Sequence, residues 1–235
     1  ILAGINGLEV GQSIVIAISM IINSSMHVFS PESYPNARQV HFLSLVLLIP
    51  FVFVSIPLYR ANKYPASVFV GDTFCYFSGM TFAVVGLVGH FSKTLCLFFI
   101  PQAINFVYSV PQLFHFLDCP RHRLPKFNPS TGLLEMSCVE FLLKPKSTIK
   151  EKLGFLMIKF LSQLKLAHLE IVESDGVSGE TKYRFNNLTL LNVFIFWFGP
   201  CHEQSLTTKL LSFQIFCTFI AFTIRYVLAP CLYII

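Results

Sequence analysis

Long apolar runs, interrupted by few charges, constrain the fold of this chain more than any other feature. Of its 235 residues, 54% are hydrophobic and only 12% are charged, which lies outside the range of ordinary soluble domains. A helix needs about 20 mostly apolar residues to cross a bilayer. Five stretches meet or approach that length: residues 8–26, 41–59, 68–91, 95–116 and 210–228. The sequence therefore predicts an all-α polytopic membrane bundle of about five transmembrane helices.

Lysine and arginine assign the two sides of this bundle, because cytosolic loops of membrane proteins are enriched in both. One connection carries Arg60 and Lys63, whereas the opposite connections carry only Arg38 and Lys93. The segment after the fourth run is the most basic: Arg121, Arg123, Lys126, Lys144, Lys146, Lys150 and Lys152. We expect this segment and residues 1–7 to be cytosolic and the C-terminus to lie across the membrane. The net charge of +5 then reflects topology rather than nucleic-acid binding.

Residues 117–205 differ in composition from the apolar runs. Charged residues return, and ESDGVSGE (173–180) gives a turn signal between HLEIVES and KYRF, which are strand-like. We expect a small cytosolic α+β insertion before the last helix. The expected domains are residues 1–116, 117–205 and 206–235. Within the insertion, LTLLNVFIFWFG (188–199) is too short to cross the bilayer and suits either an interfacial helix or a short helix packed on the bundle.

Signals of secretion, disulfides or zinc are weak in this chain. Its seven cysteines form no CxxC pair and lie mostly in or beside apolar runs, where they suit buried small hydrophobes. The sequons at Asn187 and Asn23 fall in a predicted cytosolic segment and at a span end. The chain begins without methionine, and no charged region precedes its first apolar run. We expect no signal peptide, and the chain resembles the later part of a longer protein.

Two carboxylates lie in or beside the apolar runs, Glu9 in NGLEVGQ and Asp72 in VFVGDTF. A carboxylate next to lipid is costly, so it normally faces a cavity, a cation or a partner. Asp72 follows Gly71 at the cytosolic start of its helix, where it suits a Mg²⁺ ligand completed by phosphate oxygens. An N-cap aspartate is the structural alternative.

Two further segments could bind a polar ligand. GINGLEVGQS combines Gly4, Asn6 and other glycines before the first span, and from the residues alone a helix-entry turn is the favoured interpretation. PRHRLP (120–125) holds Arg121, His122 and Arg123 between two prolines. Two guanidinium groups can grip phosphate oxygens bidentately. The alternative for this motif is a basic anchor that contacts lipid headgroups.

Three stretches in order carry a family resemblance: ILAGINGLEVGQS, YPASVFVGDTFCYFSGMTFAVVGLVGHFSKT and CPRHRLPKFNPSTGLLEMS. NNLTLLN and FTIRY extend it toward the C-terminus. On these residues the chain resembles the eukaryotic UDP-N-acetylglucosamine–dolichyl-phosphate N-acetylglucosamine-1-phosphotransferases, within the polyprenyl-phosphate sugar-1-phosphate transferase superfamily. The resemblance is weakest at residues 24–64 and 138–182.

The resemblance implies transfer of GlcNAc-1-phosphate from UDP-GlcNAc to dolichyl phosphate, which gives dolichyl-diphosphate-GlcNAc and UMP. It implies a multi-pass endoplasmic reticulum protein whose active site faces the cytosol and which uses Mg²⁺ as cofactor. Catalysis would consist of positioning and electrostatic stabilisation. The implied partners are UDP-GlcNAc, dolichyl phosphate, membrane lipid and a second copy of the chain, and no nucleic acid.

The family's site residues map onto this sequence one by one. Asp72 matches the magnesium-binding aspartate and Phe69 the aromatic residue that stacks on uracil. Gly4 and Asn6 match the uridine-contacting segment, and we count Glu9 with them as substrate-binding. Arg121, His122 and Arg123 match the motif that holds the diphosphate and recognises the GlcNAc, so Asp72 and His122 are the expected catalytic residues.

One departure from the family matters. Its members carry an adjacent acidic pair, a lysine and an asparagine magnesium ligand before the ILAGINGLE segment, and this chain has no adjacent Asp or Glu pair. We therefore expect the 235 residues alone to be inactive. A truncated, non-catalytic relative that needs a partner for the missing half-site is one alternative. A transporter is another, although the sequence shows no repeat symmetry.

Overall fold

The computed structural model describes residues 2–30, 35–143, 148–175 and 180–233. It is mainly helical and divides into two compact units, each of which is described by itself. The helical unit comprises Leu2–Gln102 and Thr207–Ile235, and the mixed unit comprises Ala103–Leu206. Lys144, Lys146 and residues 176–179 of the expected turn lie outside the described residues.

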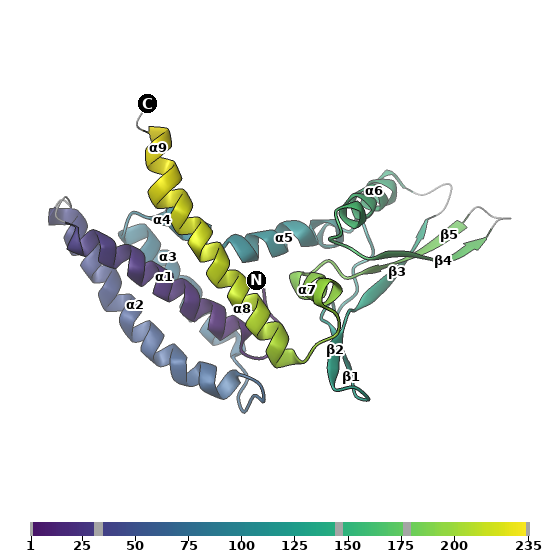
Figure 1. Ribbon diagram of the computed structural model, residues 1–235, viewed down its shortest axis with the longest axis horizontal. Coiled ribbons are helices and arrows are strands. Elements are labelled where there is room, and N and C mark those ends of the chain that lie inside the picture. Colours follow the sequence, from purple (N-terminus) through teal and green to yellow (C-terminus); the bar gives the residue numbers. More distant parts are fainter. Residues whose placement is uncertain (1, 31–34, 144–147, 176–179, 234–235) are drawn as a thin grey trace. The chain divides into compact units, whose positions relative to one another are not determined.

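The helical unit contains the long apolar helices. They are α1 (Leu8–Phe29), α2 (Pro35–Asn62), α3 (Gly71–Val88), the short α4 (Ser92–Phe98), and a C-terminal rod formed by α8 (Glu203–Thr223), the π-helical η1 (Ile224–Leu228) and α9 (Ala229–Tyr233). Helices α1 and α2 run side by side as a hairpin (Figure 1).

Four helices of the described chain are long and apolar enough to cross a membrane. The fourth expected span is instead a bent pair, α4 followed by α5 (Ile100–Leu113), whose axes differ by 67°. The pair brings the number of spans to five if it counts as one. The prediction of a polytopic helical membrane protein is therefore confirmed. The fourth span is not the continuous helix that the sequence predicted, because it is broken between α4 and α5.

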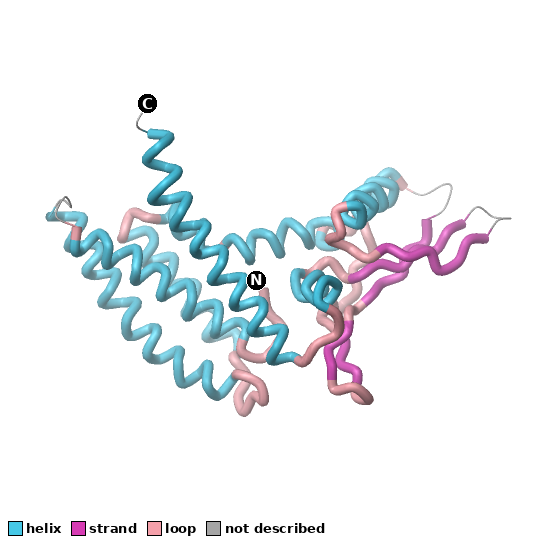
Figure 2. The backbone as a smooth tube through the Cα atoms, viewed as in Figure 1, coloured by secondary structure: helices cyan, strands magenta, loops and turns pink. Residues whose placement is uncertain are grey.

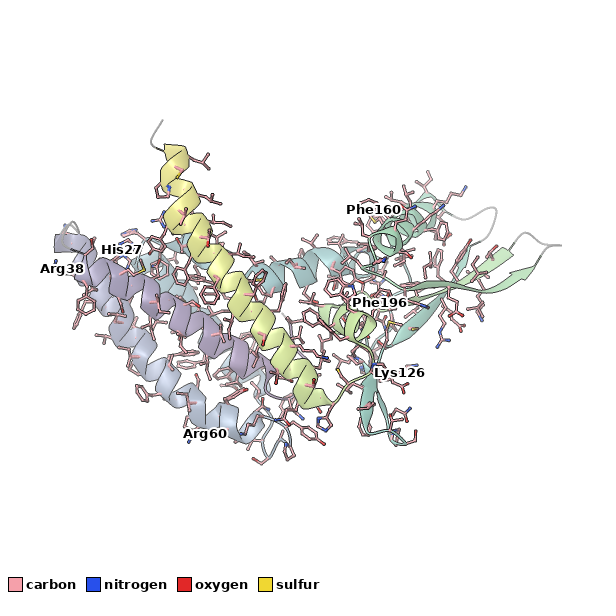
Figure 3. All side chains as sticks on the ribbon, in the orientation of Figure 1. His27, Arg38, Arg60, Lys126, Phe160 and Phe196 are labelled. Atoms are coloured by element: carbon pink, nitrogen blue, oxygen red, sulfur yellow. The ribbon has the colours of Figure 1, made fainter. Side chains whose placement is uncertain are left out.

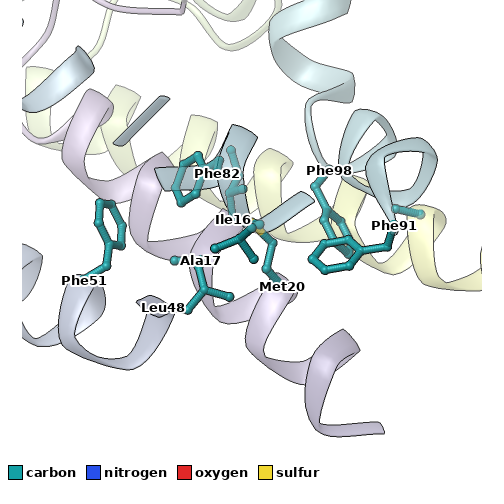
Figure 4. Close-up of a cluster of buried hydrophobic side chains, with 10 residues drawn as sticks. Ile16, Ala17, Met20, Leu48, Phe51, Phe82, Phe91 and Phe98 are labelled. Carbon is teal, nitrogen blue, oxygen red and sulfur yellow. The ribbon is translucent and has the colours of Figure 1, made fainter. Parts of the chain in front are cut away.

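The core of the helical unit joins α1, α2, α3, α4 and the C-terminal rod (Figure 4). Leu48 and Phe51 of α2 and Met20 of α1 are almost completely buried. The Phe82 ring of α3 meets that of Phe51 edge to face, with 5.2 Å between centroids, which is a favoured aromatic geometry. Because lipid tails are as apolar as these side chains, close packing rather than water exclusion stabilises such contacts.

The mixed unit contains two small antiparallel sheets (Figure 2). Strands β1 (Lys126–Asn128) and β2 (Leu133–Glu135) form a hairpin. Strands β3 (Cys138–Leu143), β5 (Glu180–Asn186) and β4 (Leu169–Asp175) form a three-stranded sheet in that order. Helix α6 (Ile149–Gln163) lies between β3 and β4 in sequence, and α7 (Leu190–Phe198) follows β5. The expected α+β insertion is therefore present, and the strands predicted on either side of ESDGVSGE pair with each other.

Helix α7 is the apolar segment for which the sequence left two interpretations. Its residues from Leu190 to Ile195 are buried, and Asn192 is completely so. It therefore packs within the mixed unit, while Trp197 and Phe198 at its C-terminal end are exposed. Helix α6 instead exposes a row of apolar side chains, one of which is labelled in Figure 3: Ile149, Leu153, Leu156 and Phe160.

Gly154, in the middle of α6, permits close contact with the chain that leads out of α5. A Cβ at this position would overlap the carbonyl group of Phe116. Overpacking of this kind typically costs ~1–3 kcal/mol, which outweighs the roughly 0.5–1 kcal/mol gained by replacing a helical glycine. We expect Gly154→Ala to lower the thermal midpoint of the detergent-solubilised protein.

Gly79 of α3 is the matched control, because a Cβ there would meet nothing within 4 Å. Gly79→Ala should leave the midpoint unchanged or raise it. An unchanged midpoint for Gly154→Ala would contradict the close approach of α6 to Phe116.

An ion pair on the exposed sheet makes a pH-dependent contribution. Lys182 Nζ lies 2.8 Å from Glu140 Oε2, and this hydrogen bond and charge hold the pKa of Glu140 below its usual value. Because the folded-state pKa is lowered, the pair stabilises the fold above the unfolded pKa, and the contribution is lost as the pH falls through the folded pKa. Lys182→Met should raise the pKa of Glu140 in a carboxyl NMR titration, whereas Lys126→Met should not.

Candidate functional site

The loop before α3 presents Asp72 to solvent. Gly71 has a φ of 70°, a left-handed conformation that favours glycine, and it begins α3. Asp72 is exposed, and its carboxylate accepts no hydrogen bond from the residues that the structure describes. The N-cap position belongs to Val70, and no side chain caps the helix. The N-cap interpretation of Asp72 is therefore wrong, and its carboxylate has no structural role within the described chain.

The glycine-rich segment before α1 is tied to the loop before α3 through one buried amide. Asn62 Oδ1 accepts a hydrogen bond from the Gly7 N–H at 2.9 Å, and Asn62 Nδ2 donates to the Val68 carbonyl at 3.0 Å. Gly7 is the N-cap residue of α1, with a φ of 81°. The helix-entry turn predicted from the sequence is therefore present. The Asn62 side chain links this turn to the loop before α3 and holds both in place.

The predicted substrate-binding residues of this segment occupy different positions in that turn. Gly4 is exposed, and its N–H donates to Glu9 Oε1 at 2.9 Å. Glu9 therefore uses one oxygen to close the turn. Asn6 is half-buried, and its carbonyl accepts a hydrogen bond from Thr207 Oγ1 at 3.0 Å. The backbone of the segment is fixed in place, which suits a surface that must meet a ligand without rearrangement.

Phe69 projects from the loop that Asn62 holds. Its side chain is 89% exposed, although a phenyl ring normally gains free energy by burial. The neighbouring Val68 carbonyl is fixed by Asn62, so the ring is presented from an anchored backbone. An aromatic face in this position is suited to stacking on a planar ligand.

Glu9 and Asp72 lie at the same end of the helical unit. Both charges act on the Cys75 thiol in the first turns of α3. Among the described residues, no group of three His, Cys, Asp or Glu side chains is placed to hold a metal ion. Mg²⁺ nevertheless binds through one or two carboxylates when water and phosphate oxygens complete its octahedral shell. Asp72, with an unpartnered carboxylate, fits the role of one such ligand.

Arg121, His122 and Arg123 belong to the mixed unit. Arg121 and His122 are exposed and Arg123 is half-buried. The carbonyl of Arg123 accepts hydrogen bonds from Asn192 Nδ2 at 3.0 Å and from Ser137 Oγ at 3.4 Å. Arg123 Nη1 is buried and has no hydrogen-bond partner in the described part of the chain. A buried guanidinium N–H without a partner is costly, so an anion there would satisfy it.

A buried network of amide side chains anchors this basic loop. Gln112 Nε2 donates to the Asp118 carbonyl at 3.2 Å and to Asn187 Oδ1 at 3.0 Å. Asn187 Nδ2 donates to Ser137 Oγ at 2.9 Å, and the Ser137 N–H donates to Asn192 Oδ1 at 2.9 Å. Gln112, Asn187 and Asn192 are at most 2% exposed. The network fixes both sides of the loop, at Asp118 and at Arg123.

Sequence reasoning did not find this network. Its signal was the set of polar residues within the NNLTLLN run, which indicated only a sequon and part of the family resemblance. Asn187 is 2% exposed and bonded through both atoms of its amide, so its role is structural. Thr189 caps α7 by accepting a hydrogen bond from the Asn192 N–H.

The comparisons with known proteins show which proteins this chain is similar to. Residues 1–90 match the model of Glycosyl transferase family 4. The UDP-N-acetylglucosamine–dolichyl-phosphate N-acetylglucosaminephosphotransferase of Schizosaccharomyces pombe is 45% identical over 99% of this chain and 51% of its own length. The protein of the same name from Saccharomyces cerevisiae is 48% identical over 92% of this chain and 46% of its own. The one from Dictyostelium discoideum is 42% identical over 96% and 46%.

The chain spans about half the length of the curated relatives it matches. The matched region includes Asp72, the glycine-rich segment and the basic loop, because the alignment covers 99% of the chain. Over nearly its whole length, this chain is therefore similar to the UDP-N-acetylglucosamine–dolichyl-phosphate N-acetylglucosaminephosphotransferases, and its residues 1–90 match Glycosyl transferase family 4.

Proposed function

We propose that this chain provides part of a membrane enzyme that transfers GlcNAc-1-phosphate from UDP-GlcNAc to dolichyl phosphate and releases UMP. The observation that carries the proposal is the 45% identity, over 99% of the chain, to a relative named for this activity. The reaction joins a lipid substrate to a water-soluble one. A set of membrane helices with exposed polar groups at one end suits that requirement.

Asp72 is proposed as a magnesium ligand of this enzyme. Its support is a carboxylate that is exposed, starts a membrane helix and makes no hydrogen bond to the described residues. Mg²⁺, when bound, neutralises charge on the diphosphate of the nucleotide sugar. Asp72 would hold the ion, and the anchored turn at Gly4 and Asn6 would position the nucleoside, with Phe69 stacked on its base.

Arg121, His122 and Arg123 are proposed to bind the sugar diphosphate. Arginine presents a planar fork of donors that matches phosphate oxygens, and His122 is free to donate a hydrogen bond. Arg123 has a buried Nη1 that lacks a partner in the described chain. A bound phosphate oxygen would accept a hydrogen bond from this donor and so provide the partner that the described chain lacks.

The endoplasmic reticulum membrane is the proposed location, with the site on the cytosolic face. The support is the excess of Lys and Arg in the loops that carry the candidate residues and the dolichyl-phosphate substrate in the names of the relatives.

Asp72→Asn tests the metal role, because it removes the charge with little change in volume. In membranes from cells whose native protein carries the substitution, we expect the rate of dolichyl-diphosphate-GlcNAc formation to fall at least about 100-fold, as is typical when a transition-state charge partner is lost. Residual activity should need more Mg²⁺. Glu170→Gln removes another exposed carboxylate, on strand β4, and should leave the rate unchanged. Wild-type activity in Asp72→Asn would remove Asp72 from the site.

Asn192→Ala tests whether the buried network positions the basic loop. Losing the hydrogen bond to the Arg123 carbonyl frees the loop, so the KM for UDP-GlcNAc should rise several-fold while the KM for dolichyl phosphate changes little. Phe141→Leu is the control, because it disturbs the buried core of the same unit on strand β3 and its side chain makes none of the hydrogen bonds of this network. A KM shift of equal size in both variants would indicate a general loss of stability and refute the positioning role.

A further inference from the structure

A second cluster of polar side chains lies at the other end of the helical unit. His27, His41, His90 and Arg225 line a cavity of about 220 Å³, here called the imidazole–arginine cavity. His27 lies in the last turn of α1, whereas Glu9 lies in its first turn, so the helical rise separates the two by about 27 Å. Figure 3 shows His27 and Arg38 at one end of the α1–α2 hairpin and Arg60 at the other. The cavity is therefore distinct from the Asp72 site.

The centre of the cluster is a stack of rings. The imidazoles of His27 and His41 lie 4.4 Å apart with an interplanar angle of 13°, and His41 also stacks on Phe91 at 5.8 Å. Gly89 permits the position of Phe91, because a Cβ there would collide with its ring. His41 is only 6% exposed, and its Nδ1 has no hydrogen-bond partner among the described residues. A buried imidazole nitrogen without a hydrogen-bond partner lowers stability, and a ligand that bonds to it removes this penalty.

Arg225 reaches the cavity from a local distortion of the last helix. Residues Ile224–Leu228 form a π-helical segment, a conformation that is rare and found frequently at functional sites. Within it, the Tyr226 hydroxyl donates to Asn23 Oδ1 of α1 at 2.8 Å. This bond fixes the distorted turn against α1 and holds Arg225 beside the cavity, where its side chain remains exposed.

Among the described residues, the cavity is lined by one fixed cation and by no carboxylate. Arg225 supplies the cation, and His27, His41 and His90 supply imidazole groups that can donate hydrogen bonds. The other lining residues, Ala37, Val40, Gly89 and Phe91, are uncharged. A fixed cation in a space without a carboxylate favours an anion there. A metal ion is a poor fit, because no group of three potential ligands within the described ranges is arranged to hold one.

We propose that the imidazole–arginine cavity binds a phosphate group. A guanidinium fork and several imidazole N–H groups are suited to phosphate oxygens, and the cavity exceeds the volume of one water molecule several-fold. The cavity lies at the end of membrane helices, where lipid headgroups are found. The phosphate group therefore belongs either to a lipid headgroup or to a soluble phosphate.

The test is histidine NMR of the purified native protein with labelled imidazoles. Detergent-solubilised protein is titrated with inorganic phosphate, and protein in phosphatidylcholine nanodiscs is compared with protein in nanodiscs that also contain phosphatidic acid. We expect the signals of His41 and His90 to shift saturably in at least one of the two arms. Arg225→Gln should weaken the binding roughly ten-fold or more, because a charge-assisted contact is lost. Arg38→Gln removes a cation near the same end that does not line the cavity, and should have no effect.

Each outcome is decisive. Shifts with phosphatidic acid alone assign the cavity to a lipid phosphate, shifts with inorganic phosphate alone assign it to a soluble one, and shifts with both show that it accepts either. No shift in either arm, or an equal response in Arg225→Gln, overturns the proposal. His41→Phe retains the ring stack, so a folded His41→Phe protein should lose affinity through the missing nitrogen alone. The result does not depend on the transferase activity.

Discussion

Amide side chains removed from water hold each unit of this protein together. In the helical unit, Gln102 Nε2 donates to Gln214 Oε1 at 2.9 Å and to Gln12 Oε1 at 3.2 Å, and Gln214 Nε2 donates to the Phe98 carbonyl. One residue thereby links α1, α8 and the break between α4 and α5. A carbonyl freed at such a break must find a donor, because lipid supplies none. Gln214 provides that donor, so the bent span depends on it.

The mixed unit uses the same chemistry for a different purpose. Its amides, Gln112, Asn187 and Asn192, bond mainly to one another and to backbone groups of the basic loop. Loops usually move more than the helices they connect. A loop whose backbone carbonyls are held by buried side chains can present arginine without the entropy cost of ordering it on binding. The network therefore converts a surface loop into a rigid support.

The sequence predicted the parts of this structure that depend on composition and short motifs. Apolar length located the spans, and strand propensity located the pair around residues 176–179. It did not predict the bend at Phe99, because Pro101 and Pro111 indicate distortion without indicating its angle, which tertiary packing decides. Nor did it predict that α7 would be buried, since an apolar segment with a tryptophan has the same composition at an interface and in a core. Most residues of the candidate site stood out by their place beside the apolar runs, and the resemblance added their roles. Neither signal indicated that Asn62 and Asn192 would position them, because an asparagine in the sequence does not show which backbone groups its amide will bond.

Some polar groups of the described chain are fully bonded within the fold, and others are not. Asn62, Asn187 and Asn192 are buried and bonded through both amide atoms, so each is fully explained by the fold. Asp72 accepts no hydrogen bond from the described residues, and Arg123 Nη1 and His41 Nδ1 lack described partners although they are buried. A buried donor or acceptor without a partner lowers stability. Gln12 Nε2, Asn23 Nδ2, Ser24 Oγ and Gln102 Oε1 also lack described partners, so a missing partner does not mark a site by itself. Arg123 and His41 differ in their setting, because Arg123 stands in the basic loop proposed to bind the sugar diphosphate and His41 lines a cavity with Arg225. The proposed role of Asp72, which is exposed, rests instead on its place at the start of α3.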